Sequence, residues 1–361
     1  MSEILEKKWL KEAVSTVPAG FSGKTAWQSP SNIALVKYWG KHGNQLPNNP
    51  SISLTLSASK SETCIQYERN DSSHLQLKFF FEGKENPAFA EKIQRFLNQI
   101  IPYFPFLDLL SLAISSSNTF PHSSGIASSA SAMSALVMGV LAIENKLTNA
   151  TKIDLIKASY FSRLGSGSAS RSVFPVAAVW GKTAFLAESS DTFALPMAQQ
   201  LHQVFQDYYD SILIIDSGTK AVSSRAGHAL MDNNPFAPAR YEQANKNIQE
   251  LYGAMQIGDL AAFIRITEAE ALQLHALMMS SNPAYFLMQP NSLAAIKAIQ
   301  NFRESTQTPL CFTLDAGPNI HLLYPAIVRK EVLVFIKNQL LPLCANGFWI
   351  DDKVGQGASA I

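Results

Sequence analysis

The stretch Phe120-Pro121-His122-Ser123-Ser124-Gly125-Ile126-Ala127-Ser128-Ser129-Ala130 is the most informative part of this sequence. It follows a short apolar segment, Leu109–Ser115, and leads into a run of Ala, Met, Leu and Val that continues to about Glu144. We interpret this order as a strand, a loop of small residues and the start of a helix. Backbone N–H groups at a helix start point outward and the helix dipole favours negative charge, so the pattern is typical of an anion site. The residues alone leave an ordinary serine-rich turn open, and the Walker A pattern G-x-x-x-x-G-K-[ST] is absent.

The segments around this loop predict a mixture of strands and helices, from apolar residues at a spacing of two or at helical spacing. The predicted strands are Ser51–Leu56, Thr63–Tyr67, Leu75–Phe81, Leu109–Ser115, Ser211–Asp216 and Leu310–Leu314, with a hairpin of Val176–Trp180 and Thr183–Ala187 around Gly181. The predicted helices are Asn86–Ile101, Thr151–Leu164, Ala239–Ile257, Leu260–Met279 and Ser292–Gln300, while Val332–Leu340 suits either state. Because strands and helices do not alternate strictly, we expect an α+β fold rather than a doubly wound sheet.

Length and composition set the class of protein. A chain of 361 residues is too long for one ordinary core, and we expect two domains, residues 1–200 and 201–361. A hydrophobic content of 47% with 16% charged residues excludes a disordered chain. The formal net charge of +1 argues against general binding to nucleic acid or to a membrane surface.

The cysteines and the N-terminal segment indicate in which cellular compartment the protein is found. Three cysteines, far apart in the sequence, form no metal or redox motif and imply no disulfide framework. The first 20 residues mix Glu with Lys and lack the apolar segment of a signal peptide. The longest apolar stretch, Ala135–Ile143, is much shorter than a membrane span. We therefore expect a soluble, cytoplasmic protein.

Four further segments carry candidate chemistry, and each also has a plain structural interpretation. Arg163–Ser172 could clamp an anion between two arginines, or could be a solvated connection. Asp315 ends an apolar strand and could act as a base, although Asp before Ala-Gly-Pro more often starts a turn. Lys37–Lys41 and Ser217–Arg225 combine cations with hydroxyls, as an anion site or as solvated surface. The seven histidines show no metal-binding spacing, and we interpret His228 and His275, in predicted helices, as structural.

Five of these segments together resemble the diphosphomevalonate decarboxylases, which belong to the GHMP kinase superfamily. They occur in the family's order and span most of the chain. They are SPSNIALVKYWGKHGNQLPNNPSISLTL at 29–56, FPHSSGIASSASAMSAL at 120–136, RLGSGSASRS at 163–172, VSSRAG at 222–227 and FTLDAGPN at 312–319. The resemblance implies two lobes, an N-terminal ribosomal-protein-S5-like α/β domain and a C-terminal ferredoxin-like α+β domain, with the active site between them. The resemblance also leads us to expect Cys in many relatives at the position of Ser170.

The resemblance also implies roles for single residues. The catalytic group would be Asp315 as the base, with Lys37 and Arg171. The substrate would be held by Tyr38, Lys41, Ser166, Gly167, Ser168, Arg171 and Arg225. The ATP phosphates would be bound by Gly125, Ala127, Ser128, Ser129 and Lys220, and Ser129 would be the protein's contact to Mg²⁺.

The reaction implied by the resemblance is an ATP-dependent decarboxylation, which makes the protein a carboxy-lyase of the mevalonate pathway of isoprenoid biosynthesis. ATP would phosphorylate the 3-hydroxyl of mevalonate 5-diphosphate, and loss of phosphate and CO₂ would yield isopentenyl diphosphate. Three alternatives stay open: decarboxylation of mevalonate 5-phosphate, a kinase that stops at the 3-phosphate, and an inactive metabolite-binding protein. The expected assembly is a homodimer, without nucleic-acid or membrane partners.

Overall fold

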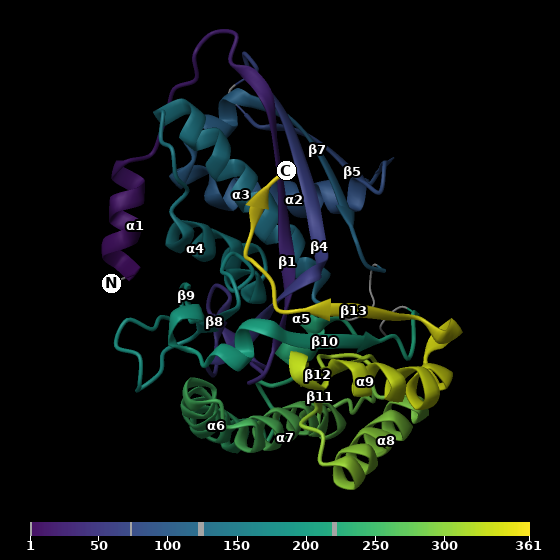
Figure 1. The fold of residues 1–361 in the computed structure, drawn as a ribbon. Helices are drawn as coiled ribbons and strands as arrows, with labels where there is room; N and C mark the ends of the chain where they lie inside the picture. The colour runs from purple at the N-terminus through teal and green to yellow at the C-terminus, as the bar shows by residue number, and fades with distance from the viewer. Residues whose placement is uncertain (1, 73, 122–125, 219–221) are drawn as a thin grey trace.

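The computed structural model describes residues 2–72, 74–121, 126–218 and 222–361, and these residues form two lobes, one above the other in Figure 1. The upper lobe contains α1 (Ser2–Lys11), β1 (Ser22–Ala34), β2 (Lys41–His42), β3 (Leu46–Pro47), β4 (Ser51–Arg69), β5 (Gln76–Phe81), β6 (Lys84–Glu85), α2 (Pro87–Ile100), β7 (Leu110–Asn118), α3 (Ser128–Thr148), α4 (Leu155–Gly165), β8 (Ala177–Trp180) and β9 (Ala194–Pro196). The lower lobe contains β10 (Tyr208–Leu213), α5 (Ser224–Ala229), α6 (Ala237–Ile257), α7 (Leu260–Met279), α8 (Pro290–Thr306), β11 (Cys311–Thr313), β12 (Ile320–Pro325), α9 (Arg329–Phe335) and β13 (Trp349–Lys353).

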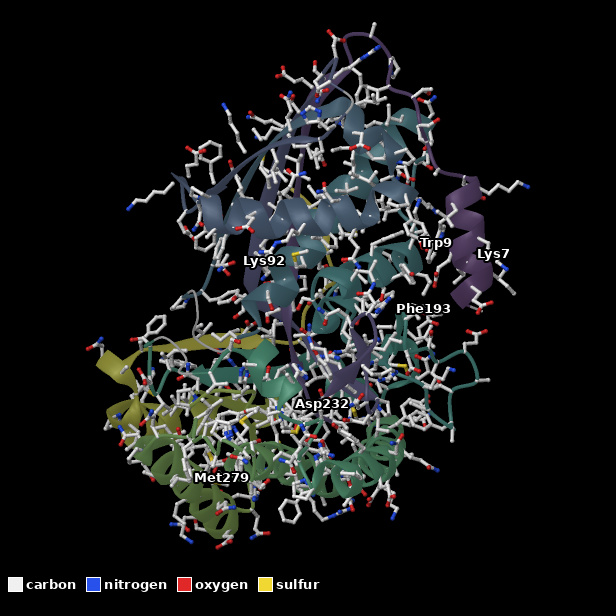
Figure 2. The ribbon with its side chains drawn as sticks, turned by 180° about the vertical axis from the view of Figure 1, so that it is seen from behind. Lys7, Trp9, Lys92, Phe193, Asp232 and Met279 are labelled. Carbon is white, nitrogen blue, oxygen red and sulfur yellow. The ribbon has the colours of Figure 1, made fainter. Side chains whose placement is uncertain are left out.

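The upper lobe is built on a sheet with the order β14-β1-β4-β7-β5-β6, to which β8 and β9 attach through β4. The central strand β4 joins two strands that the sequence predicts separately. Its second half alternates buried Ile65 and Tyr67 with exposed Gln66 and Glu68, as expected for a strand with one face on the core. Helices α3 and α4 and the aromatic residue Trp9 of α1 pack on that core. Figure 2 shows Trp9 on the inner side of α1, where its ring lies 5.1 Å from that of Tyr160.

The lower lobe has an antiparallel sheet with the order β11-β12-β10-β13. Along the chain a strand is followed by helices, two strands, a helix and a strand, which is the ferredoxin-like arrangement that we expected. Local signals delimit its helices. Asp259 caps the start of α7 by accepting a hydrogen bond from Ala262 N, and α6 ends at Gly258 with φ +78°. The undecided segment Val332–Leu340 is helical.

The two lobes are joined by the last part of the chain. Asp352 of β13 is buried, and its carboxylate accepts hydrogen bonds from the backbone N–H groups of Ser57, Ala58 and Ser59 in β4, at 2.7–2.8 Å. Strand β14 (Ser359–Ala360) then pairs with β1, and Figure 1 shows this yellow arm running up beside the upper sheet. One apolar core also contains residues of both lobes, so the lobes are held in a defined relation. The domain boundary at residues 200 and 201 stays a prediction.

The predicted hairpin around Gly181 is wrong. The strand β8 pairs with β4 and with β9, and residues 183–187 form no strand. In this loop Lys182 N donates to the Asp191 carboxylate and Thr183 N donates to Ser189 Oγ, at 2.8 Å each. These side-chain acceptors satisfy backbone groups that a hairpin would have used, and they favour an irregular loop.

Helix α3 is the only helix in the described part of the chain that is long and apolar enough to cross a membrane. Its apolar window is 72% buried within the protein, against β1 and β4. A core helix of a soluble protein passes the same test of length and composition, so the helix by itself is weak evidence for a membrane span.

Candidate active site

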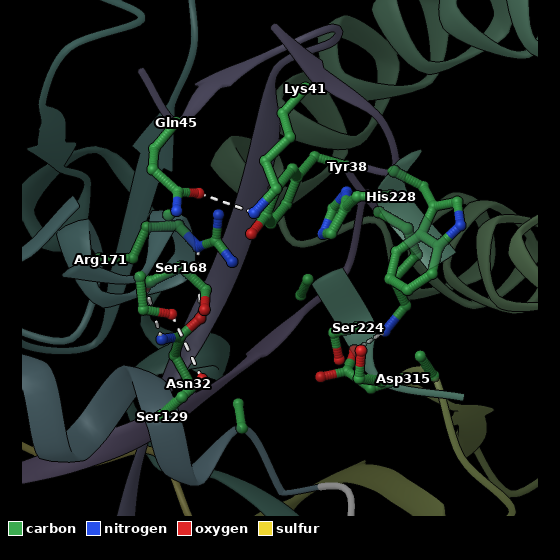
Figure 3. A pocket seen from close by; sticks show the side chains of 18 of the residues that line it. Asn32, Tyr38, Lys41, Gln45, Ser129, Ser168, Arg171, Ser224, His228 and Asp315 are labelled. Carbon is green, nitrogen blue, oxygen red and sulfur yellow. Dashed lines mark hydrogen bonds and ion pairs between the residues drawn. The ribbon is translucent and has the colours of Figure 1, made fainter. Parts of the chain in front are cut away.

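A cavity of about 510 Å³ lies between the two lobes, and most of the predicted site residues line it. Those residues are Lys37, Tyr38, Lys41, Ala127, Ser129, Ser166, Gly167, Ser168, Arg171 and Asp315. Ser128 lines a smaller neighbouring cavity instead. Gly125 and Lys220 lie outside the described residues, as does the side chain of Arg225, whose backbone belongs to α5. Figure 3 shows the labelled side chains converging from both lobes. The separate roles of these residues stay predictions.

Asp315 and Lys37 form an ion pair across the lobes. Asp315 follows the end of β11, and its Oδ1 lies 2.8 Å from Lys37 Nζ. The Lys37 side chain is only 2% exposed, whereas that of Asp315 is 25% exposed and faces the cavity. Burial lowers the pKa of Lys37, and the nearby carboxylates of Asp315 and Glu270 act in the opposite direction. The pair therefore offers an accessible carboxylate held in place by a buried ammonium group.

Arg171 brings a buried cation to the same cavity. Its Nε donates to Asn32 Oδ1 at 3.2 Å and to Ser53 Oγ at 3.0 Å, while its guanidinium lies 5.6 Å from the ring centre of Tyr38. Burial lowers the pKa of Arg171 to about 10, so the group stays charged near neutral pH. Its Nη1 is buried and has no hydrogen-bond partner among the described residues. A buried guanidinium N–H without a partner suits an anion that enters from the cavity.

The side of the cavity opposite Asp315 is polar and closely packed. Lys41 Nζ donates to Gln45 Oε1 at 2.7 Å, and Figure 3 shows this ammonium group beside the Tyr38 hydroxyl. Gly167 makes the packing possible, since a Cβ there would lie 2.7 Å from the Trp180 ring and 2.9 Å from the Tyr38 hydroxyl. A larger residue would push Tyr38 out of place, which explains a glycine at this position.

The start of α3 closes the cavity on a third side. Ala127 immediately precedes the helix with φ +43° and ψ +40°, an uncommon left-handed conformation for a residue with a side chain. Strain of this kind is found where function requires a defined loop shape. Ser129 is exposed, and its Oγ lies 3.3 Å from Ser166 Oγ, so the two small-residue segments meet here.

A second cavity of about 210 Å³ adjoins the first at Ser129 and Lys92. Its walls include the aromatic rings of Phe79, Phe81 and Phe89. Figure 2 places Lys92 on α2, near the junction of the lobes. The combined space therefore has an aromatic compartment, a helix start and a polar compartment, in that order.

A second layer of charged residues holds Lys37 by its backbone. The Glu270 carboxylate of α7 accepts a hydrogen bond from Lys37 N at 2.8 Å and another from Asn247 Nδ2 at 2.6 Å. Arg240 of α6 pairs with Glu270 and also donates to Lys37 O at 3.3 Å. Glu270 is fully buried, so the lower lobe positions a residue of the upper lobe. Sequence reasoning missed this group, because a charged residue in a helix is usually on its solvated face.

We predict that Glu270→Ala destabilises the protein by about 3–5 kcal/mol, because it leaves Arg240 charged and buried without its carboxylate. Urea unfolding measures this change. Glu270→Gln keeps the size of the side chain and one hydrogen-bond acceptor, so its free energy of unfolding should fall by less. Glu91→Gln removes an exposed partner of Arg95, and its free energy of unfolding should stay within about 0.5 kcal/mol of the wild-type value. Equal effects of Glu270→Ala and Glu91→Gln would contradict the assignment.

Further cavity residues that sequence reasoning missed are Asn32, Gln45, Lys92 and His228. Asn32 links two predicted segments, since its Nδ2 donates to Ser168 O at 3.1 Å and to Ser172 Oγ at 2.8 Å. Ser170 is buried and donates to Gly167 O at 2.8 Å, which stabilises the same loop. The described residues contain no cluster of three or more His, Cys, Asp or Glu side chains that could hold a metal ion.

Comparisons with known proteins show which family the whole chain resembles. A family model described as the diphosphomevalonate decarboxylase-like N-terminal domain matches residues 29–194. A second, described as the mevalonate 5-diphosphate decarboxylase C-terminal domain, matches residues 211–352. A diphosphomevalonate decarboxylase from Gibberella zeae is 30% identical over 317 residues, which cover 82% of this chain and 79% of the relative. One from Ganoderma lucidum is 29% identical and covers 85% of this chain and 80% of the relative.

Solved structures give the same result. The mevalonate diphosphate decarboxylase from Staphylococcus aureus superposes with a TM-score of 0.81 at 27% identity, covering 94% of this chain and 98% of that one. A structure of MDDEF in complex with MVAPP, AMPPCP and magnesium has a TM-score of 0.78 at 26% identity, covering 94% of this chain and 99% of that one. These likenesses confirm the predicted two-lobed fold class. Together with the cleft described above, they lead to one conclusion: this chain belongs to the diphosphomevalonate decarboxylase family.

Proposed function

We propose that this protein is a carboxy-lyase that converts mevalonate 5-diphosphate and ATP to isopentenyl diphosphate, CO₂, ADP and phosphate. The observation that carries the proposal is the position of Asp315 in the cleft, paired with buried Lys37 and sharing the cavity with Arg171, Lys41 and the start of α3. Family membership supports it, and a related structure contains MVAPP, AMPPCP and magnesium. Sequence and fold together therefore support the same reaction.

Asp315 would act as the base in the first step. It accepts the proton of the 3-hydroxyl while that oxygen forms its bond to the phosphoryl group and the bond from the phosphorus to ADP breaks. A carboxylate is a weak base for an alcohol, so proton transfer and phosphoryl transfer must be concerted. Lys37, 2.8 Å from Asp315, keeps the carboxylate oriented and adds positive charge beside the transferring group.

In the second step the new phosphate leaves C3, because it is a far better leaving group than hydroxide. Positive charge develops at C3, and the electron pair of the C–CO₂⁻ bond becomes the new double bond as CO₂ departs. The protein's part is to keep the substrate in place. Its diphosphate and carboxylate carry about three to four negative charges at neutral pH, and Arg171 and Lys41 supply cations on the cavity wall.

The nucleotide would occupy the two adjoining cavities. The aromatic compartment of Phe79, Phe81 and Phe89 suits an adenine ring, and the start of α3 suits the phosphates. ATP supplies the phosphoryl group, and Mg²⁺ offsets the charge of its phosphates. Ser129 is the protein residue that we propose as a contact to the ion, whose other ligands would come from phosphate oxygens and water, as is usual for Mg²⁺.

The direct test is to incubate the purified protein with ATP, Mg²⁺ and either mevalonate 5-diphosphate or mevalonate 5-phosphate, and to follow ADP and CO₂ separately. Equal amounts of both products with the diphosphate are expected. ADP without CO₂ would make the protein a 3-kinase, equal yields only with the monophosphate would change the substrate, and no product would support a binding protein.

Removal of Mg²⁺ is expected to abolish turnover but to leave binding of mevalonate 5-diphosphate nearly unchanged. With excess EDTA, turnover should fall to the background of the assay, because the nucleotide phosphates lose their counterion. Binding of mevalonate 5-diphosphate, measured by calorimetry, should change little, since its cations come from the protein. Restored turnover on addition of Mg²⁺ is the control, and full activity in EDTA would contradict a role for the ion.

The assembly and location are also part of the proposal. We propose a cytoplasmic protein that works as a homodimer, without nucleic-acid or membrane partners. The burial of α3 in the upper core and the three cysteines, none of them in a disulfide, support the location. Light scattering of the purified protein tests the dimer.

A further inference from the structure

His228 lies in the wall of the cavity, although the sequence favours a structural histidine there. It belongs to the short helix α5 and is 5% exposed. Its ring stacks on Tyr38, with centres 5.0 Å apart and planes at 28°, and lies 4.3 Å from the ring of Trp39. Figure 3 shows His228 beside Tyr38, on the side of the cavity that also holds Lys41. The contacts with these two aromatic rings restrict the orientation of the imidazole.

The hydrogen bonds of His228 determine which ring nitrogen carries the proton. Gly40 N donates to Nδ1 at 2.9 Å, so Nδ1 must present a lone pair. Burial and the neighbouring Lys41 lower the pKa of His228 to about 3, so the ring is neutral near pH 7. The single proton is therefore on Nε2. Among the described residues, none forms a hydrogen bond with Nε2.

We propose that His228 is a further substrate-binding residue, whose Nε2–H donates a hydrogen bond to an oxygen of the substrate's diphosphate. The inference rests on the proposed function. The diphosphate is the most highly charged group of the substrate, and Lys41 lies close enough to His228 to influence it electrostatically. Asp315 and Lys37 mark the place of the reacting 3-hydroxyl. A neutral donor next to an ammonium group gives direction to the bond without adding like-charge repulsion.

Two substitutions of His228 distinguish the role of Nδ1 from that of Nε2. In His228→Asn the amide can take the place of Nδ1 and accept from Gly40 N, but nothing replaces Nε2. In His228→Gln the longer amide can place an N–H where Nε2 was, and the bond from Gly40 is lost. Both variants lose the stacked ring, so they are matched in that respect. We expect His228→Asn to raise KM for mevalonate 5-diphosphate about tenfold or more, and His228→Gln to stay within about threefold, with kcat less affected than KM in both.

Inhibition by inorganic diphosphate tests whether His228 contacts the diphosphate group of the substrate. Its inhibition constant against mevalonate 5-diphosphate should rise in His228→Asn by a factor similar to that for KM. Binding of ATP, measured separately, should not change. His202→Asn makes the same change at an exposed histidine that caps a short turn elsewhere, and it should leave both constants as in the wild type.

Three results would overturn the inference. If His228→Asn keeps wild-type constants while His228→Gln is impaired, the ring serves only the backbone of Gly40. If both variants equal the wild type, His228 has no part in binding. If KM rises but inhibition by inorganic diphosphate does not change, the contact is not to the diphosphate. Failure of the proposed function gives a different result, since the wild-type protein would then release no CO₂ from the substrate.

Discussion

Asp315→Asn is expected to lower turnover by about 10²–10⁴-fold, the range for removal of a general base, while substrate and ATP still bind. The reason is local. The carboxylate faces the cavity and is held by Lys37 at 2.8 Å, so it is available to take a proton from a bound alcohol. An amide has nearly the same shape and can still accept a hydrogen bond from Lys37, but it cannot accept the proton. Release of ADP and of CO₂ should fall together, because both depend on the first step.

The test of Asp315→Asn needs binding and stability measurements beside the rate. Dissociation constants for mevalonate 5-diphosphate and ATP should change little, and the melting temperature shows whether the cleft is intact. Glu304→Gln, an exposed residue of α8, is the matched acid-to-amide control and should leave kcat unchanged. Full activity of Asp315→Asn would refute the assignment of the base.

Arg171→Ala is expected to lower kcat/KM for mevalonate 5-diphosphate by about 100-fold or more, mainly through KM. Each hydrogen bond to a charged group contributes about 1.5–3 kcal/mol, and a guanidinium can make two in parallel. Arg171 is oriented by Asn32 and Ser53, and its buried Nη1 has no partner among the described residues. A substrate anion would complete the hydrogen bonds of this group.

Variants of Arg171 also distinguish charge from geometry. Arg171→Lys keeps the charge but loses the planar fork, so it should recover only a small part of kcat/KM. Arg171→Met retains the packing against Tyr38 and Trp180 and controls for an unfilled space. Arg95→Ala, on the exposed face of α2, is the surface control. An unchanged kcat/KM in Arg171→Ala would remove this residue from the site.

The α+β class and most of the elements could be predicted because their signals are local. Helix α2 begins where Asn86 accepts a hydrogen bond from Phe89 N, and α6 ends at a left-handed glycine. The strand β7 and the small-residue loop before α3 follow from a change in spacing along the chain. The ordered motifs then identified the family, although no single motif would have been sufficient.

Local sequence patterns could not predict which distant residues pair with one another. The partner of β8 is β9, after a loop, rather than the next apolar segment. The last strand returns to β1 of the other lobe, which no local pattern indicates. His228 resembled an ordinary helical histidine because the ring that it contacts belongs to Tyr38, 190 positions earlier in the chain.

By itself the sequence determined the fold class, the family and the chemical types of the cleft residues, because those depend on local spacing and on side-chain identity. Only the tertiary structure decided that Asp315 meets Lys37, that Glu270 holds the backbone of Lys37, and that Gly40 N donates to Nδ1 of His228. The physical reason is that burial and hydrogen-bond partners set the charge and direction of a side chain, and those partners come from the other lobe.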